Sequence, residues 1–325
     1  MGKYGSLLLT VSLCLTLTPA QSQDEPAPIK VDVDIVNILC SVRDKKGGLI
    51  GNLTKDDFTV FEDGKQQTIK YFTRETDLPL TIGLLIDVSG SQRRLIEDER
   101  HAALQFFSQV LRKKDMAFVI SFGGEAELLQ DFTNSQRLLE AALNDLRVNS
   151  GAGGLHPGPV STAGQPRGTV LRDAVYLAAT DRLQKEVGRK AMVLITDGMD
   201  QGSRLSKESA IEAAQKADSM IYSIYYVDQA AYMGIGGFGM GVSDHELRQM
   251  SEDTGGRLMH VDRKNTLNDI FKQIQDEMRS QYAIGFSSTN EKKDGSFRRL
   301  EIRTRDKNLK VQARKGYYAT PAERQ

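Results

Sequence analysis

The chain has 325 residues, of which 39% are hydrophobic and 26% charged. This composition is ordinary for a globular protein, and the length allows one large domain and a small one. The 43 basic and 43 acidic residues cancel to a formal net charge of zero. Because no basic arm or acidic tail stands out, electrostatics do not favour nucleic acid or a membrane surface as a partner.

The first 20 residues have the pattern of an export signal. Lys3 supplies positive charge, residues 7–17 are mostly apolar, and residues 18–20 (TPA) offer a cleavage site of small residues. The apolar run is too short to span a bilayer comfortably, and no later segment reaches about 20 consecutive apolar residues. We therefore expect an exported protein that is periplasmic, cell-surface or secreted, and that associates with a membrane only if the signal is retained. Residues 21–28 would follow as a flexible leader.

Cysteine usage predicts no internal disulfide in the mature protein. The chain has two cysteines, and Cys14 would leave with the signal. Cys40 then remains alone in an apolar, strand-like run, where we expect a buried, inert thiol.

Residues 29–78 are predicted to form one part of a small β domain. The run 31–44 alternates apolar and polar residues, which is typical of a half-buried strand. The segment 58–72 predicts a hairpin that turns at Asp63-Gly64. So few strands are not expected to be stable alone.

From residue 80 onward, strands and helices alternate. Continuous apolar runs predict buried parallel strands, and two shorter runs predict further strands of the same sheet. Repeated strand–helix units predict a doubly wound, mainly parallel α/β sheet over residues 79–282. The expected strands lie at 81–87, 115–122, 190–197, 219–227 and 257–261. The expected helices lie at 92–113, 134–147, 170–184, 206–217 (with Ser206 as N-cap), 243–254 and 266–281.

The last part of the chain, residues 283–320, returns to β structure. Alternating runs predict strands within 281–289, 296–306 and 309–319. Each flank alone has too few strands for a stable core. We therefore predict that the two flanks pair into one small β-sandwich, with the α/β domain inserted in it.

Two aspartates mark the expected functional edge of the α/β sheet. Asp87 and Asp197 each end an apolar strand, and ligands of such sheets bind beyond the carboxyl ends of strands, where the strand order reverses. Ser89 and Ser91 follow Asp87 at alternate positions, so an extended loop could point all three the same way. Carboxylate and hydroxyl oxygens are hard donors that suit Mg²⁺. Two carboxylates balance a dication and leave a coordination position for an external carboxylate.

These residues resemble the metal-ion-dependent adhesion site of the von Willebrand factor A domain family. That site carries D-x-S-x-S, then a threonine on a distant loop, then an aspartate after another strand. Here residues 87–91 (DVSGS) match the first element, Thr169 in "RGTVLRDAVYLA" the second, and Asp197 in "LITDGMD" the third. The resemblance covers about residues 80–283, and the flanks are similar to those of bacterial secreted proteins that carry this domain.

The resemblance implies a function as well as a fold. It implies metal-dependent protein binding or adhesion, without catalysis, in which a glutamate or aspartate of a protein partner completes the metal coordination. The serines and the threonine would contact Mg²⁺ or Mn²⁺ directly or nearly so, while the aspartates would act largely through water. The expected metal residues are Asp87, Ser89, Ser91, Thr169 and Asp197.

Two other functions stay open. One is a hydrolase or phosphatase-like enzyme that uses Asp87 and a divalent metal, although "DVSGS" lacks the G-x-S-x-G pattern and position 89 is not a second aspartate. The other is a domain that binds metal only for stability. A nucleotide-binding interpretation of the glycine-rich segment 234–241 fails, because it lacks the P-loop lysine and contains the bulky Phe238. Asp87 could also be an ordinary capping or turn residue.

Several other features lie around the expected metal edge. The loops 149–168 and 228–242 would flank it and are predicted recognition loops. Asp173 is predicted to lie on a helix surface or to support the metal ligands, and Asp200 to be a solvated turn residue. The helix at 265–280 runs directly into a strand of the small domain, so a shift of that helix could reorient the domain.

Overall fold

The computed structural model describes residues 35–75, 78–148, 168–228 and 244–319. The expected signal (1–20) and leader (21–28) lie outside these residues. So do the two expected recognition loops, apart from their end residues Gly168 and Asp228. The predictions made for those segments stay predictions.

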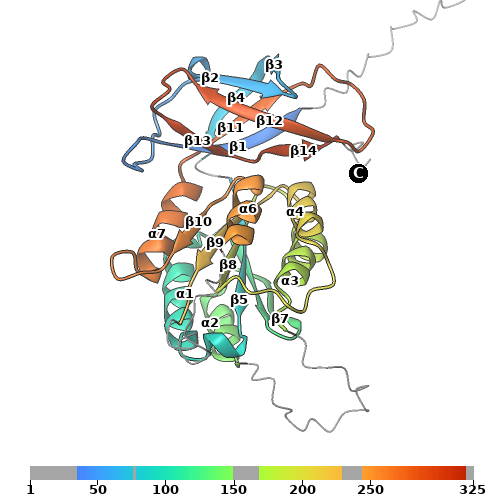
Figure 1. Ribbon diagram of the computed structural model, residues 1–325. Helices are drawn as coiled ribbons and strands as arrows, with labels where there is room; N and C mark the ends of the chain where they lie inside the picture. Colours follow the sequence, from blue (N-terminus) through green and yellow to red (C-terminus); the bar gives the residue numbers. More distant parts are fainter. Residues whose placement is uncertain (1–34, 76–77, 149–167, 229–243, 320–325) are drawn as a thin grey trace, which may run out of the picture. The chain divides into compact units, whose positions relative to one another are not determined.

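A six-stranded sheet forms the centre of the α/β domain, in the order β10-β9-β8-β5-β6-β7 (Figure 1). All its pairs are parallel except that of the edge strand β7, which is antiparallel to β6. Every residue of β5 and of β8 is buried, which explains the long apolar runs in both strands. The strands are β5 (Leu80–Asp87), β6 (Met116–Phe122), β7 (Ala126–Thr133), β8 (Arg189–Thr196), β9 (Ser219–Tyr225) and β10 (Leu258–His260).

Helices cover both faces of this sheet, so the predicted doubly wound fold is confirmed. One face carries α1 (Ile96–Val110), α2 (Gln136–Asn144) and α7 (Leu267–Met278). The other carries α3 (Leu171–Leu177), which continues with π-helical bonding over Ala178–Leu183, together with α4 (Lys207–Lys216) and α6 (His245–Thr254).

Local sequence signals explain where these helices begin. The hydroxyl of Ser206 accepts a hydrogen bond from the backbone N–H of Ser209, as expected of an N-cap. Thr266 begins α7 with a capping box to Asp269. The first helix is predicted to start at residue 92, but α1 starts at Ile96. The difference arises because residues 90–92 form a separate 3₁₀ turn.

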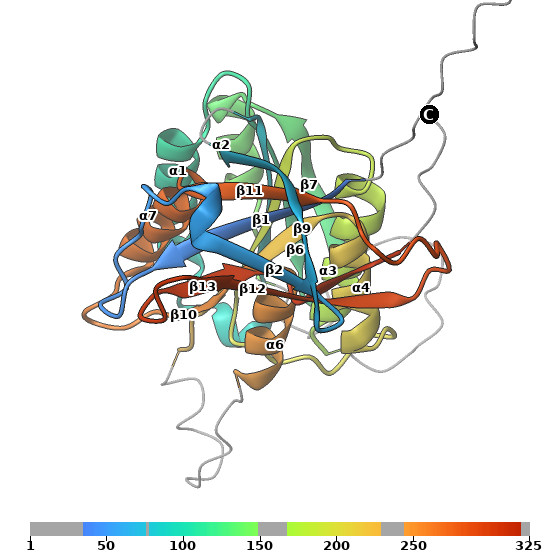
Figure 2. The same ribbon diagram turned by 90° about the horizontal axis from the view of Figure 1, so that it is seen from above.

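The two flanks of the chain form one small β domain, as predicted. It has two antiparallel four-stranded sheets, β13-β1-β11-β4 and β14-β12-β2-β3. Each sheet contains strands from both flanks, and Figure 2 shows β1 beside β11. The strands are β1 (Val36–Arg43), β2 (Phe58–Glu62), β3 (Lys65–Gln67), β4 (Ile69–Glu75), β11 (Gln281–Phe286), β12 (Phe297–Thr304), β13 (Lys310–Ala313) and β14 (Gly316–Tyr318).

The details of the β domain agree with the sequence patterns at two points and differ at one. Asp63 and Gly64 both have positive φ (47° and 80°), which is the geometry of a two-residue hairpin turn. Cys40 is buried in the core, and burial raises the pKa of its thiol to about 12. The single strand predicted over 309–319 is instead two strands, because the chain leaves one sheet after Ala313 and joins the other at Gly316.

None of the helices in the four described ranges has both the length and the apolar character needed to cross a membrane.

Gly83 allows close packing in the middle of β5. A Cβ atom at this position would lie 2.3 Å from the Cζ atom of Phe118, whose buried ring packs edge-on against Phe132. We expect Gly83→Ala to lower the free energy of unfolding by about 1–3 kcal/mol, measured by urea denaturation. Gly90→Ala is the control, since no atom lies within 4 Å of its Cβ position. Equal stability of the two variants would contradict this packing.

Candidate metal centre

The two predicted aspartates lie at the point where the strand order of the sheet reverses. β5 and β8 are parallel neighbours. The strands that follow β5 in the chain lie on one side of this pair, and those that follow β8 lie on the other. Asp87 is the last residue of β5, and Asp197 follows directly after β8. Both therefore stand at the same edge of the sheet, the edge at which such folds bind ligands.

Hydrogen bonds join the serines of the first loop to the second aspartate. The hydroxyl of Ser91 donates to Oδ2 of Asp197 at 2.6 Å, and the hydroxyls of Ser89 and Ser91 are 3.0 Å apart. The backbone N–H of Ser89 donates to Oδ1 of Asp87 at 2.9 Å. The first loop and the end of β8 thus form one polar cluster.

Thr169 borders the loop that follows Asp197. Its carbonyl oxygen accepts hydrogen bonds from the backbone N–H groups of Gln201 (3.1 Å) and Gly202 (3.0 Å). The backbones of these two segments are in close contact, since a Cβ atom on Gly202 would lie 2.0 Å from the carbonyl oxygen of Gly168. Thr169 itself is 9% exposed. Thr169 therefore contacts the loop that begins at Asp197, while Asp87, Ser89 and Ser91 lie at and just beyond the end of β5.

Thr196 supports Asp87, although no sequence motif points to it. Its hydroxyl donates to Oδ2 of Asp87 at 2.6 Å and accepts from the backbone N–H of Gly198 at 3.0 Å. Gly198 has a φ of 79°, the left-handed conformation that a sharp turn after β8 requires. The position of Thr196 beside Asp197 is its one sequence signal, but that signal does not distinguish it from any other strand residue.

The carboxylates of Asp87 and Asp197 are buried close enough to repel each other, so an ionised Asp87 is destabilised. Burial raises the pKa of Asp87 to about 6, and the charge of Asp197 contributes to the rise. A divalent cation would remove both costs, because it replaces lost hydration and screens the two acids from each other. The oxygen donors present therefore fit Mg²⁺ or Mn²⁺.

Hydroxyl groups are needed to complete such a site. Within the described residues, no group of three or more His, Cys, Asp or Glu side chains is placed to hold a metal ion. Asp87 and Asp197 alone would supply few ligands, and Ser89, Ser91 and Thr169 are the hydroxyl side chains that the sequence predicts for the same site.

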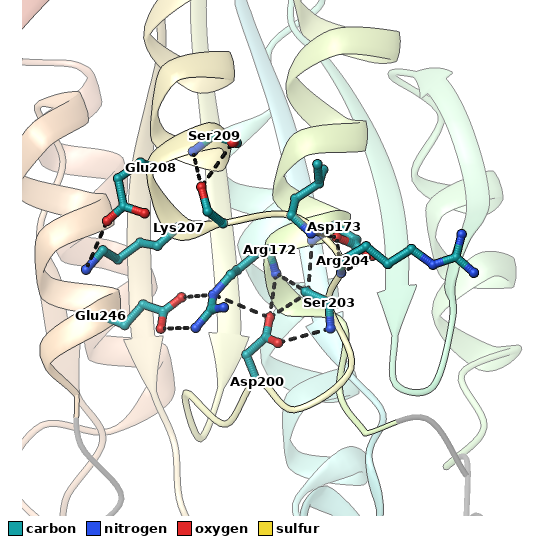
Figure 3. A network of polar contacts seen from close by, with 11 residues as sticks. Arg172, Asp173, Asp200, Ser203, Arg204, Lys207, Glu208, Ser209 and Glu246 are labelled. Atoms are coloured by element: carbon teal, nitrogen blue, oxygen red, sulfur yellow. Dashed lines mark hydrogen bonds and ion pairs between the residues drawn. The ribbon is translucent and has the colours of Figure 1, made fainter. Parts of the chain in front are cut away.

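Two further aspartates fasten the loop after Asp197 to the start of α3 (Figure 3). Oδ2 of Asp200 accepts from the backbone N–H of Arg172 at 2.9 Å and from the hydroxyl of Ser203 at 2.6 Å. The side chain of Asp200 is 3% exposed, so the prediction of a solvated turn residue is wrong. The loop folds back over this carboxylate and gives it hydrogen-bond donors of the protein in place of water.

Asp173 has a similar role on the first turn of α3. Its carboxylate accepts from the backbone N–H groups of Arg204 (3.1 Å) and Leu205 (3.0 Å). The guanidinium of Arg172 pairs with both oxygens of Glu246 on α6, at 2.5 and 2.8 Å. Thr169 lies two residues before α3 and Asp197 precedes this loop, so the network joins the two segments that carry these predicted metal residues.

Residues 82–199 match the family model of the von Willebrand factor type A domain. This chain contains a von Willebrand factor type A domain. The match runs from β5 to the residues just beyond Asp197, so it includes all five positions of the predicted site. The family resemblance inferred from the D-x-S-x-S motif is confirmed.

The solved structures that are similar to this chain are distant from it in sequence. An aerotolerance-related membrane protein from Bacteroides fragilis is 17% identical, with a TM-score of 0.44 over 61% of this chain and 98% of that one. The conserved hypothetical protein BatB from Bacteroides thetaiotaomicron is 18% identical, with a TM-score of 0.43 over 61% and 97%.

A third structure is proximal thread matrix protein 1 from the mussel byssus, with a zinc-occupied MIDAS motif. It is 16% identical, with a TM-score of 0.46 over 65% of this chain and 49% of that one. With TM-scores below 0.5, these structures say nothing about the function of this von Willebrand factor type A domain. No curated protein matches the chain.

The raised pKa of Asp87 predicts how acidity and metal act together on this von Willebrand factor type A domain. An acid whose pKa is higher in the folded than in the unfolded state contributes stability at low pH. That stability is lost as the pH rises through about 6. The metal-free domain should therefore lose up to about 3 kcal/mol between pH 4 and pH 7.5, and Mg²⁺ should restore part of it. Thermal melts at pH 5 and pH 7.5 should show the larger Mg²⁺-induced rise in melting temperature at pH 7.5. A larger rise at pH 5 would contradict this linkage between Asp87 and the metal.

Proposed function

We propose that the von Willebrand factor type A domain binds one divalent cation, Mg²⁺ or Mn²⁺, through Asp87, Ser89, Ser91, Thr169 and Asp197. The observation that carries this proposal is the hydrogen-bonded row from Ser89 through Ser91 to Asp197, which joins the loops after two neighbouring strands. The hydroxyl oxygens would serve as direct ligands. The aspartates would balance the charge, largely through water.

A protein partner would complete the coordination with a glutamate or aspartate side chain. The two aspartates neutralise a dication, and the hydroxyls add no further charge. The ion can therefore still attract an external carboxylate. The protein would be exported, and it would act in the periplasm, at the cell surface or in the medium, as a binding or adhesion module.

The test is capture of a partner with and without the metal. Immobilised protein is exposed to an envelope extract with Mg²⁺ or with a chelator, and the captured protein is purified and its exposed acids are replaced by amides. Binding should be lost with chelator, in Ser91→Ala, and in one acid-to-amide variant of the partner. Ser108→Ala is the matched control, because Ser108 lies on the exposed side of α1 and its hydroxyl donates to the carbonyl oxygen of Gln105 in the same helix. Binding that survives both the chelator and Ser91→Ala would contradict the proposal.

The same purified proteins also test the two alternative functions, a metal-dependent enzyme and a purely structural metal site. A metal-dependent hydrolysis of phosphate esters that is lost in Asp87→Asn would favour an enzyme. A rise in melting temperature with Mg²⁺, without metal-dependent binding of any captured protein, would favour a purely structural ion.

A further inference from the structure

Glu99 is an acid within the apolar stripe of α1. The residues of this helix that face the sheet include Ile96, Ala103 and Phe106, and Glu99 lies among them with 0% exposure. The core-facing stripe of a helix normally takes apolar residues, and buried acids are rare unless they are paired. The proposed metal ligands do not include Glu99, so its burial needs another explanation.

The two carboxylate oxygens of Glu99 have no hydrogen-bond partner among the described residues. Oε1 of Gln92 is equally buried and unpartnered, while the amide nitrogen of Gln92 donates to the carbonyl of Tyr226 at 3.3 Å. The charge of Glu99 also acts on the Tyr226 hydroxyl. Three acceptor oxygens of α1 and the turn before it are therefore buried without a hydrogen-bond partner among the described residues. An ionised carboxylate that is buried without a hydrogen-bond donor is costly, so the burial of Glu99 favours a proton on its carboxyl.

The charged groups among the described residues that act on the Glu99 carboxyl are all acids. Burial raises the pKa of its carboxyl well above the usual value. The charges of Asp87 at the end of β5, Asp197 after β8 and Asp98 on α1 raise it further. Two of these three acids are proposed metal residues. A dication held between Asp87 and Asp197 would reverse the sign of the field that Glu99 experiences.

We propose that Glu99 is a positioning carboxyl of the metal centre, protonated while the cation is absent and ionised once the cation is bound. Uptake of the cation then expels one proton from Glu99 to the solvent and adds a third negative charge to those of Asp87 and Asp197. This inference rests on the proposed metal site. Glu99 is not a ligand itself, because the described residues contain no three acids placed to share one ion.

Glu99→Gln removes the titrating proton and keeps the shape of the side chain. The matched control is Glu97→Gln, two residues earlier on the same helix, where the side chain is 63% exposed. Infrared spectra of the metal-free wild type at pH 7 should show the carbonyl band of a buried, protonated acid. That band should be absent in Glu99→Gln, present in Glu97→Gln, and lost from the wild type when Mg²⁺ is added.

Calorimetry in buffers of different ionisation enthalpy counts the protons released by metal binding. The wild type and Glu97→Gln should release about one proton more per Mg²⁺ than Glu99→Gln does. The affinity of Glu99→Gln for Mg²⁺ should be about tenfold lower, as is usual when a group that supports metal ligands is lost. If Glu99→Gln does not fold, carbon-13 NMR of labelled glutamate carboxyls in the wild type gives the same information. One carboxyl should change from neutral to ionised as Mg²⁺ is added.

Each other outcome decides against the proposal. A metal-free wild type without the acid band, or with a band that persists after Mg²⁺ binds, would overturn it. Equal proton release by wild type and Glu99→Gln would overturn it but leave the metal site intact, provided that Ser91→Ala still abolishes Mg²⁺ uptake. If the wild type binds no divalent cation, both the proposed function and this inference are wrong.

Discussion

Glu277→Ala is expected to lower the free energy of unfolding by about 3–5 kcal/mol, which is typical when one partner of a buried ion pair is removed. Glu277 lies on the last turn of α7 with 0% side-chain exposure. Its Oε2 accepts from Arg43 at 2.5 Å and from Arg257 at 2.9 Å, and its Oε1 accepts from the hydroxyl of Ser41 at 3.1 Å. Alanine would leave two mostly buried guanidinium groups without this shared anion.

Urea denaturation followed by circular dichroism measures this effect. Glu212→Ala is the control, because Glu212 forms a surface pair with Lys216 on α4 and both side chains are more than 40% exposed. The control should lose less than about 1 kcal/mol. If Glu277→Ala were no more destabilising than Glu212→Ala, the buried network around Glu277 would not stabilise the contact between α7 and β1.

The Glu277 network also bears on the prediction that the helix at 265–280 couples the metal site to the β domain. Arg43 and Ser41 belong to β1, so this carboxylate bonds α7 directly to a strand of the small domain. The coupling itself stays a prediction. Spin labels on α7 and on β12 would test it, and equal distances with and without a metal-dependent ligand would refute it.

Asp197→Ala is expected to lower the affinity for Mg²⁺ or Mn²⁺ by at least about 100-fold, since losing even a supporting group costs 10–100-fold. The substitution leaves Asp87 to balance the dication alone. It also removes the acceptor that holds the Ser91 hydroxyl in place at 2.6 Å. Isothermal calorimetry measures the change, with circular dichroism to show that the variant is folded.

The control for Asp197→Ala is Asp131→Ala. Asp131 lies on β7, and its side chain is 56% exposed in a pair with Arg182. This variant should bind the cation as the wild type does. Wild-type affinity in Asp197→Ala would show that the cation, if any, binds elsewhere.

Patterns set by burial are predictable from the sequence. β5 and β8 are largely apolar because both of their faces are covered, and their apolar runs predict that Asp87 and Asp197 lie at one edge of the sheet. The joining of the two flanks is predictable for a related reason, since neither could bury a core alone. The hairpin at Asp63-Gly64 follows from the backbone conformation that glycine and aspartate tolerate.

Features that depend on tertiary neighbours are not predictable in this way. Asp200 is expected in water, but the polar donors that cover it come from Arg172 and from Ser203 in its own folded loop. Thr196 has no sequence signal that distinguishes it from other strand residues, because its hydrogen bond to Asp87 forms only when β8 packs beside β5. The split between β13 and β14 is likewise not predictable. The two strands belong to different sheets, but the alternating sequence pattern does not change between them.

Anomalous diffraction from crystals grown with Mn²⁺ would locate the proposed cation itself. We predict one anomalous peak at the carboxyl edge of β5 and β8, in contact with the hydroxyl oxygens of Ser89, Ser91 and Thr169. Asp87 and Asp197 should lie beside it, directly bound or one water molecule away. A crystal without such a peak, or with its Mn²⁺ bound by other residues, would contradict the proposed metal centre.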